Sequence, residues 1–208
     1  MGLDKNRDKR MEFGMEQNEI RKKIKKALDK GRYEHTRGVM YTAGCLAMAH
    51  GCSVEKAMLA GLLHDCAKCI PNDEKLKLCK KNNIVVNEVE RQSPYLLHAK
   101  LGAYLAETEY GIKDPEVLHA IRVHTTGAAD MSLLDKIVFI ADYIEPGRSK
   151  ATNLPQIRQV AFRDLDECLL MILHDTLKYE SGRGSALDPA TQIAYEYYKQ
   201  YRKGESKA

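Results

Sequence analysis

The stretch from Ala57 to Lys68 constrains the fold of this chain most strongly, because an apolar run with no polar face leads directly into the sequence HDCAK. Such a run predicts a buried helix, which would carry His64 and Asp65 into a place with little water. An ionised Asp buried alone is costly, so a cation, most simply a metal ion, is the expected companion of Asp65. Lys68 follows His64 by four residues, which predicts that the two side chains share one helical face.

The remaining apolar spacing is helical, and no segment alternates polar and apolar residues as a strand would. Capping residues set several boundaries: Ser53 should begin the buried helix, Asp114-Pro115 another, and Ser132 with Asp135 should form a capping box. Besides the buried helix, we expect helices at residues 17–30, 32–50, 72–81, 94–111, 115–124, 133–144, 156–162, 166–180 and from 189 onward. The predicted fold class is therefore all-α.

Two further residues should mark helix ends. Gly31 is expected to end the first helix as a C′ residue, and Asn72 is expected to cap the helix at 72–81. A chain of 208 residues suits a single domain, which we place at residues 17–203. Residues 1–16 are polar and lack periodicity, which predicts a short, flexible, basic extension, and residues 204–208 form a tail.

Charge and cysteine content limit the class of protein. The formal charge of +4 is uneven, because residues 1–30 hold ten Lys and Arg against six Asp and Glu. A basic helix there could touch nucleic acid or a membrane, but a solvated face is the commoner origin of such charge, so we expect no specific nucleic-acid binding. No apolar run reaches bilayer length, and six Cys without a secretion signal indicate free thiols, including the lone CxxC at residues 66–69. We expect a cytoplasmic protein that does not bind membranes.

Six side chains on or beside the core-facing helices have the chemistry of metal ligands: His35, His64, Asp65, His98, His124 and Asp142. Six ligands suffice for two ions. Imidazoles and carboxylates without thiolates at zinc-site spacing favour iron(II) or manganese over a structural zinc. A carboxylate between two sets of His can bridge two ions, which turn water into hydroxide and hold a phosphoryl oxygen. Spacing alone leaves open the alternative that these are ordinary core residues.

A second copy of the HDxxK pattern occurs at residues 174–178, again after an apolar run. Composition cannot separate the two copies. No His follows the second copy, so all of its partners would have to come from upstream. We therefore interpret His174 and Asp175 as the polar end of a core helix, and we give His50 and His119 the same ordinary interpretation.

The order of the candidate ligands resembles that of the HD-domain metal-dependent phosphohydrolases. Four stretches carry a closer resemblance: RYEHT at 32–36, HDCAK at 64–68, HTTG at 124–127 and ADYIEPGR at 141–148. They look like the bacterial YqeK group, the symmetrical diadenosine tetraphosphate hydrolases, over about residues 18–200, and ADYIEPGR is the most specific of them. The resemblance implies an all-helical HD domain that cuts a dinucleoside polyphosphate into two nucleoside diphosphates.

The resemblance also implies roles for residues at matching positions. The implied metal ligands are His35, His64, Asp65 and Asp142, and His98 and His124 could complete a second metal site. The implied catalytic residues are Asp65, Lys68, His98 and His124, and the implied substrate-binding residues are Arg32, Asp65, Lys68, His98, His124, Tyr143 and Arg148. One position departs from the pattern: Asp188 precedes Pro189 where the group carries His, which leaves the role of this helix start open.

The positions of these residues in the sequence are also compatible with phosphate binding. Arg32 precedes His35 by three positions, so the two share a helical face. Arg148 follows a Pro-Gly pair in a loop, from which its side chain can reach the mouth of a site. Lys68 could bind phosphate or pair with a nearby acid, and Tyr143 could pack in the core or stack on a base.

The expected reaction is hydrolysis of diadenosine tetraphosphate to two ADP, by attack of a metal-activated hydroxide on a phosphoanhydride. Iron(II) is the expected cofactor, manganese or cobalt could replace it, and both a dinuclear centre and a homodimer are left open. Two alternatives remain: another nucleotide phosphohydrolase or cyclic-nucleotide phosphodiesterase of the superfamily, and a regulatory partner that binds a nucleotide without turnover. The presence of all six ligands argues against the regulatory alternative.

Overall fold

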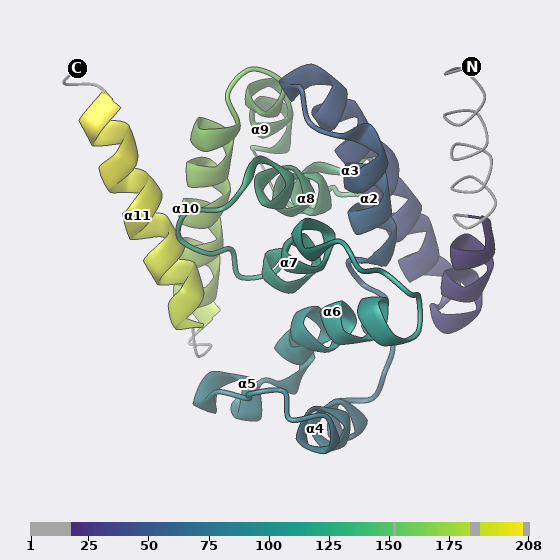
Figure 1. Cartoon of the computed structure of the whole chain (residues 1–208). Helices are drawn as coiled ribbons and strands as arrows, with labels where there is room; N and C mark the ends of the chain where they lie inside the picture. The colour runs from purple at the N-terminus through teal and green to yellow at the C-terminus, as the bar shows by residue number, and fades with distance from the viewer. Residues whose placement is uncertain (1–17, 152, 184–187, 206–208) are drawn as a thin grey trace, which may run out of the picture.

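The protein folds into helices in the computed structural model, which describes residues 18–151, 153–183 and 188–205 (Figure 1). A helical segment at residues 18–27 comes first, and these ranges contain no strand, which confirms the predicted all-α class. The elements that follow are α2 (Lys30–His50), α3 (Val54–Leu63), α4 (Asn72–Lys81), α5 (Glu88–Gln92), the 3₁₀ helix η1 (Pro94–Leu97), α6 (His98–Thr108), α7 (Pro115–Val123), α8 (Leu133–Ile144), α9 (Leu154–Ala161), α10 (Leu165–Arg183) and α11 (Pro189–Glu205).

Helix α8 lies near the centre of the fold and organises the core (Figure 1). It packs against α2, α3, α7, α9 and α10. Ile137, Ile140 and Ala141 on this helix are completely buried, and burying a side chain as large as Ile stabilises the fold by about 2 kcal/mol. Asp142 follows Ala141 directly, so a helix held by five others carries a carboxylate into the middle of the molecule.

A smaller apolar cluster lies where α4 and η1 meet α6, toward the bottom of Figure 1. Its buried members are Ala67, Cys79, Leu97 and Leu101. Because Ala67 belongs to the HDCAK stretch, this cluster anchors the chain just beyond His64 and Asp65.

Three predicted helix starts are confirmed by their hydrogen bonds. Ser132 accepts from the amide of Asp135, and the Asp135 carboxylate accepts from the amide of Ser132, so the capping box of α8 is present. Asp114 accepts from two amides at the start of α7, and Ser53 accepts from the amide of Lys56 in α3. Each side-chain cap is worth about 1 kcal/mol, which is enough to fix where these helices begin.

The predicted boundary before α2 is wrong. The first helical segment stops at residue 27, and Asp29 is the N-cap of α2, where its side chain accepts from the amide of Arg32 at 2.8 Å. Gly31 therefore lies in the first turn of α2 and does not end a helix. An Asp whose side chain reaches the third amide of a helix outweighs the general preference of Gly for helix C-termini.

The stretch from Ala57 to Lys68 is only partly helical, which corrects the prediction for Lys68. Helix α3 ends at Leu63 with His64 as its C-cap, and residues 64–69 form consecutive turns. The amide of Lys68 donates to the carbonyl of Asp65 at 2.8 Å, the i to i+3 spacing of a tight turn. Lys68 therefore does not share a helical face with His64.

Other differences concern α4, α5 and α6. Helix α4 begins at Asn72 as predicted, but Pro71 occupies the N-cap position and makes no side-chain hydrogen bond. The helix expected at 94–111 is split, because Pro94–Leu97 forms a 3₁₀ helix and α6 begins at His98. The short helix α5, which Asn87 caps, is absent from the predicted set.

The predicted extension at residues 1–16 lies outside the described residues. Helix α11 runs to Glu205, two residues into the predicted tail, and residues 206–208 also lie outside the described part. The domain limits 17–203 stay a prediction. Within the described ranges, no helix combines the length and the apolar character needed to cross a bilayer.

Candidate metal centre

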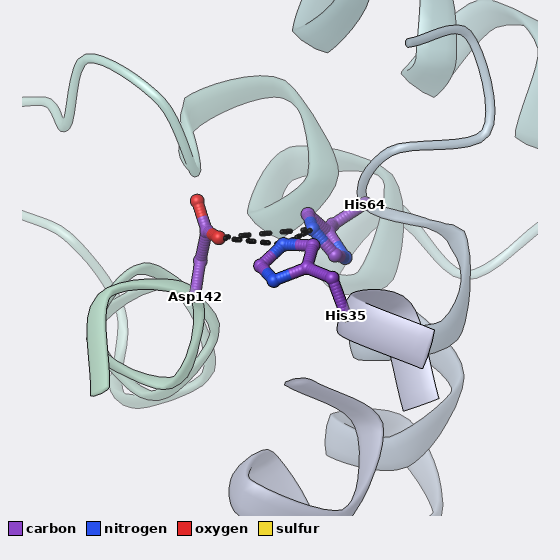
Figure 2. A group of neighbouring side chains, drawn as sticks. All are labelled: His35, His64 and Asp142. Atoms are coloured by element: carbon purple, nitrogen blue, oxygen red, sulfur yellow. Dashed lines mark hydrogen bonds and ion pairs between the residues drawn. The ribbon is translucent and has the colours of Figure 1, made fainter. Parts of the chain in front are cut away.

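The six predicted ligands meet in the interior, although they come from elements far apart in the sequence. One half of the cluster joins α2, the end of α3 and α8. His35 Nε2 lies 3.0 Å from Asp142 Oδ1 and 3.3 Å from His64 Nε2. Figure 2 shows the Asp142 carboxylate directed at both imidazoles. The close approach of α2 and α3 depends on Gly61, because a Cβ there would lie 3.0 Å from the Cα of Met40.

The other half of the cluster joins the turn after α3 to α6 and α7. Asp65 lies between the two halves: its Oδ2 is 3.4 Å from His64 Nε2, and its Oδ1 is 3.2 Å from His98 Nε2. His98 Nε2 lies 3.2 Å from His124 Nε2. The structure thus brings together all six residues that were chosen from the sequence.

Backbone carbonyls orient three of the imidazoles. Nδ1 of His64, His98 and His124 lies 2.7, 2.6 and 2.7 Å, respectively, from the carbonyl oxygen of the residue three positions earlier. A carbonyl can only accept, so each Nδ1 donates, and a neutral ring then presents the lone pair of Nε2 to the cluster. Burial lowers the pKa of His98 to about 4, which keeps this ring neutral at pH 7. Lone pairs that face one another and a carboxylate repel in a buried place, so a cation between them would be favourable.

Asp65 gives the clearest sign that a cation fits here. The residue is 2% exposed, and its Oδ1 is a buried atom without a hydrogen bond. Burial acts to raise the pKa of Asp65, but the adjacent His64 imidazole favours the ionised form, and the net result is a pKa well below the ordinary value. Burial acts to raise the pKa of Asp142 as well, but the nearby His35 and His64 imidazoles and the Arg148 guanidinium hold it well below the ordinary value. Two carboxylates therefore stay ionised in a largely buried place.

Two overlapping groups of side chains could hold an ion. One consists of His35, His64 and Asp142, and the other of His64, Asp65 and His124; within each group the ligand atoms lie within 4.8 Å of one another. Both groups offer imidazole nitrogen and carboxylate oxygen and no thiolate, which suits a first-row divalent ion. The residues present therefore fit a metal ion.

His98 belongs to neither group and contacts Lys68 and Thr125. Lys68 Nζ lies 3.1 Å from His98 Nε2, and Thr125 Oγ1 lies 3.1 Å from Nε2 of both His98 and His124. Burial lowers the pKa of Lys68 below its ordinary value, and Asp65 opposes that shift. Lys68 thus brings an ammonium group to the cluster despite its turn conformation.

A cleft of about 610 Å³ opens onto the cluster, and two arginines line it. Arg32 Nη1 donates to Asp65 Oδ2 at 2.8 Å, and Arg148 Nε donates to the Asp142 carbonyl at 2.8 Å. Arg148 Nη2 also pairs with the Asp142 carboxylate. Both guanidinium groups are partly exposed, so they can bind anionic groups that enter the cleft.

The lining of the cleft is also partly apolar. It includes Phe139, Leu154, Ile172 and the half-buried Tyr143. Burial raises the pKa of Tyr143, so its phenol stays neutral. An aromatic ring beside aliphatic side chains can hold a planar base.

The second HD pair does not join the centre. His174 is exposed and lies beside Tyr195, and the Asp175 carboxylate accepts from the Asn153 side chain. Among the described residues, neither one belongs to a possible metal group. The pair lies within α10 and not at its end, and its non-metal interpretation stays a prediction.

The remaining candidates have ordinary partners. His50 Nε2 lies 2.8 Å from the carbonyl of Ala161, and His119 pairs with Asp135. Asp188 accepts from the amide of Ala190 at 2.9 Å, and its other oxygen accepts from Asn87 at 3.3 Å. An Asp at this position thus caps α11 and ties it to the loop before α5.

Sequence reasoning missed two residues that touch the cluster. Thr125 directly follows His124 in the HTTG stretch, and Glu145 follows α8 in the ADYIEPGR stretch, with its Oε1 3.0 Å from Nδ1 of His35. Both stand inside stretches that carry the resemblance. That membership was the available signal, but neither residue lies on a core-facing helix, which was the criterion for choosing ligands.

Comparisons with known proteins agree with this geometry. The HD domain family matches residues 32–147. A Bacillus subtilis protein named bis(5′-nucleosyl)-tetraphosphatase, symmetrical, is 35% identical over 174 residues, which cover 84% of this chain and 92% of that protein. A protein of the same name from Halalkalibacterium halodurans is 39% identical, over 83% of this chain and 91% of its own length.

A solved structure shows the same architecture. The crystal structure of a predicted HD superfamily hydrolase from Clostridium acetobutylicum, described as involved in NAD metabolism, matches with a TM-score of 0.86 at 39% identity. The match covers 88% of this chain and 97% of that one. The region matched by the HD domain contains all six clustered ligands. The chain belongs to the HD domain family, in the group of relatives named symmetrical bis(5′-nucleosyl)-tetraphosphatases.

Proposed function

We propose that this protein hydrolyses diadenosine tetraphosphate and related dinucleoside polyphosphates to nucleoside diphosphates. The observation that carries the proposal is a cluster of imidazoles and carboxylates at a cleft lined by the cationic side chains of Arg32 and Arg148. Phosphate chains need such cations, and phosphoanhydride hydrolysis needs an activated water. The names of relatives that align with more than four fifths of this chain support the choice of substrate.

The proposed principal ligands are His35, His64, Asp65 and Asp142. A divalent ion held by them would lower the pKa of a bound water and supply a nucleophile at neutral pH. Iron(II) is the proposed ion, since nitrogen and oxygen ligands without thiolate suit it, and manganese or cobalt(II) could replace it. His98 and His124 could hold a second ion, which would compete with Lys68 for His98 Nε2.

The remaining proposed roles belong to residues that bind and orient the phosphate chain. Arg32 and Arg148 offer planar forks of donors that match phosphate oxygens, and Lys68 adds a compact charge beside His98. Asp65, Lys68, His98 and His124 are the proposed catalytic set because they surround the place where the attacked phosphate would lie. Tyr143 on the cleft wall is proposed to stack on a base.

The same arrangement predicts where the substrate is cut. Three cations, on Arg32, Lys68 and Arg148, can seat a diphosphate unit with its nucleoside end toward Tyr143. The phosphorus over the centre is then the second one from that nucleoside. Water adds to that phosphorus and its bond to the bridging oxygen farther from this nucleoside breaks, so a tetraphosphate bridge yields two diphosphates, and a triphosphate bridge yields a monophosphate and a diphosphate.

Product analysis tests this proposal. Protein purified without oxygen is analysed for metal and then incubated with diadenosine tetraphosphate, and an early time point is separated by chromatography. ADP is expected as the only nucleotide product. Equal amounts of ATP and AMP would contradict the symmetrical cut. Turnover of cyclic nucleotides alone would favour another phosphodiesterase of the family, and binding without turnover in iron(II), manganese and cobalt(II) would favour a regulatory partner.

Location and assembly are secondary proposals. All six Cys lie in the described residues and are free thiols, which supports the cytoplasm, where thiols stay reduced. The homodimer stays a prediction, which sedimentation of the metal-loaded protein can test.

A further inference from the structure

One imidazole of the centre is oriented differently from the other three. His64, His98 and His124 lie at helix boundaries, where a backbone carbonyl is within reach of each Nδ1. His35 lies inside α2, where the carbonyls of the helix are already bonded to amides four residues on. Its Nδ1 instead lies 3.0 Å from Oε1 of Glu145, which is 110 residues away in the sequence.

The Glu145 carboxylate is buried and held at both oxygens. The residue is 3% exposed, Oε1 faces His35, and Oε2 accepts from the amide of Gly147. Across the described ranges, no Lys or Arg forms an ion pair with this carboxylate. A buried carboxylate needs a compensating charge. The imidazole of His35 is the group that can connect this charge to a cation in the centre.

Two glycines make room for the carboxylate. Gly38 follows His35 by three positions on the same face of α2, and a Cβ on Gly38 would collide with Glu145 Oε2. A Cβ on Gly147 would lie 3.0 Å from both carboxylate oxygens. Because Gly38 and Gly147 have no side chains, there is space for the Glu145 carboxylate to reach Nδ1 of His35.

The backbone that carries Glu145 is also fixed. Arg158 on α9 donates to the carbonyl of Ile144 at 2.9 Å, of Glu145 at 2.9 Å and of Arg148 at 3.0 Å. A guanidinium group at the C-terminal end of α8 also interacts favourably with the helix dipole. The position of Glu145 is thus set from α2, from α9 and by its own turn.

We infer that Glu145 is a positioning residue that fixes the proton of His35 on Nδ1 and thereby raises the metal affinity of the centre. The inference rests on the metal centre of the proposed function. Once Nδ1 donates to the carboxylate, Nε2 presents its lone pair toward Asp142 and the ion, and the carboxylate increases the basicity of the ring. Removing such a partner lowers metal affinity about 10- to 100-fold in other metalloproteins.

Cobalt(II) titration of metal-freed protein, followed by absorption, measures this affinity directly. Glu145→Gln keeps the shape and removes the charge, whereas Gly38→Ala keeps the charge and displaces the carboxylate. Both variants are expected to bind cobalt(II) about 10- to 100-fold more weakly than the unchanged protein.

Two matched controls separate positioning from general stability. Glu90 is equally buried but pairs with Lys100 and the α5 cap. Glu90→Gln should therefore lower the melting temperature without changing cobalt(II) affinity. Gly44 lies on α2 like Gly38, and the nearest atoms that a Cβ there would meet belong to the flexible side chain of Met58 and, at 3.8 Å, to Val54. Gly44→Ala should leave cobalt(II) affinity unchanged.

Chemical rescue of cobalt(II) affinity adds a further test, because added formate would not restore the affinity if Glu145 only stabilised the fold. A cavity of about 410 Å³, lined by His35, Gly38 and Glu145, opens on the outer side of the carboxylate. Formate can therefore reach the space left in Glu145→Ala. Increasing formate should strengthen cobalt(II) binding by this variant severalfold, while chloride at the same concentration should not.

The outcomes distinguish the inference from the proposed function. Cobalt(II) affinity within twofold of the unchanged protein in both Glu145→Gln and Gly38→Ala would overturn the inference, and so would an equal loss in Glu90→Gln. No cobalt(II) binding by the unchanged protein would overturn the metal centre and the inference together. Normal cobalt(II) binding by the unchanged protein and weaker binding by both variants, without diadenosine tetraphosphate hydrolysis, would overturn only the proposed function and leave the role of Glu145 supported.

Discussion

The two HDxxK copies have the same letters and different surroundings. Within each pair the imidazole nitrogen and the carboxylate oxygen are similarly close, at 3.4 Å for His64 and Asp65 and 3.5 Å for His174 and Asp175. The side chains of the first pair are 0% and 2% exposed, whereas those of the second are 58% and 27% exposed. The motif thus brings an imidazole next to a carboxylate in both places, but only the fold supplies burial and further ligands.

The place of each pair in its helix explains the difference. His64 ends α3, which points into the centre of the fold, where α2, α7 and α8 surround it. His174 lies within α10, between α8 and α11 in Figure 1, with its ring directed toward Tyr195. An HD pair becomes a candidate metal site when a helix ends at it in the interior and other helices bring ligands to the same point.

Replacing the carboxylate of each pair should give the largest contrast. Asp65→Asn removes a buried charge that lies between the two halves of the cluster, so bound metal and turnover of diadenosine tetraphosphate should fall, turnover by about 10³-fold. Asp175→Asn should leave both within twofold and affect stability at most. Metal analysis and initial rates measure the two effects. The assignment would be reversed if the Asp175 variant lost metal and the Asp65 variant kept it.

The lysines that close the two motifs should differ next. Lys68 Nζ lies 3.8 Å from Asp65 Oδ1, and Lys178 is exposed. Lys68→Ala is expected to lower kcat/KM by about 10²-fold, because a cation beside the phosphate is lost from a partly dry site. Lys178→Ala serves as the matched control and should change kcat/KM by less than twofold. Equal effects of the two changes would show that Lys68 acts only through overall charge.

The third residue of each motif should give the smallest contrast, because it reports only how deeply the motif is buried. Burial raises the pKa of the Cys66 thiol to about 12, so it stays neutral and unreactive at pH 8. Thr176 stands at the same place in the second copy. Iodoacetamide at pH 8 should label a Thr176→Cys variant at the new thiol and leave Cys66 unlabelled, as site-resolved mass spectrometry can show. The exposed Cys69 is the internal positive control, and labelling of Cys66 as fast as that of Cys69 would contradict the burial of the first motif.

Sequence reasoning succeeded where the physical signal is local. The capping box of Ser132 and Asp135 places α8 correctly, because both partners lie within three residues of each other. The turn conformation of Lys68 could not be predicted in the same way, because no Gly or Pro interrupts the HDCAK stretch. At Asp29 and Gly31 two local preferences compete: Asp favours the start of a helix, and Gly favours the end of one. The sequence does not show which preference is stronger here.

Contacts between distant segments are the other part that the sequence could not supply. The ligand set was chosen from residue chemistry and resemblance, and the structure then showed that the six side chains converge. Glu145 has no such chemistry signal, because an acid in a loop is usually solvated. Its partner His35 lies 110 residues earlier, so only the packing of α2 against α8 reveals the pair.

The order of the ligands along the chain also bears on how the protein is made. All six lie between residues 35 and 142, whereas α9, α10 and α11 come later. During synthesis from the amino terminus, the ligand set is complete before these last three helices exist. An ion that joins α2 to α8 would close a loop of about a hundred residues, and such a crosslink removes several kcal/mol of unfolded-chain entropy. The six Cys of this chain are all free thiols. The ion would therefore crosslink distant segments through coordination bonds, as disulfides do in other proteins.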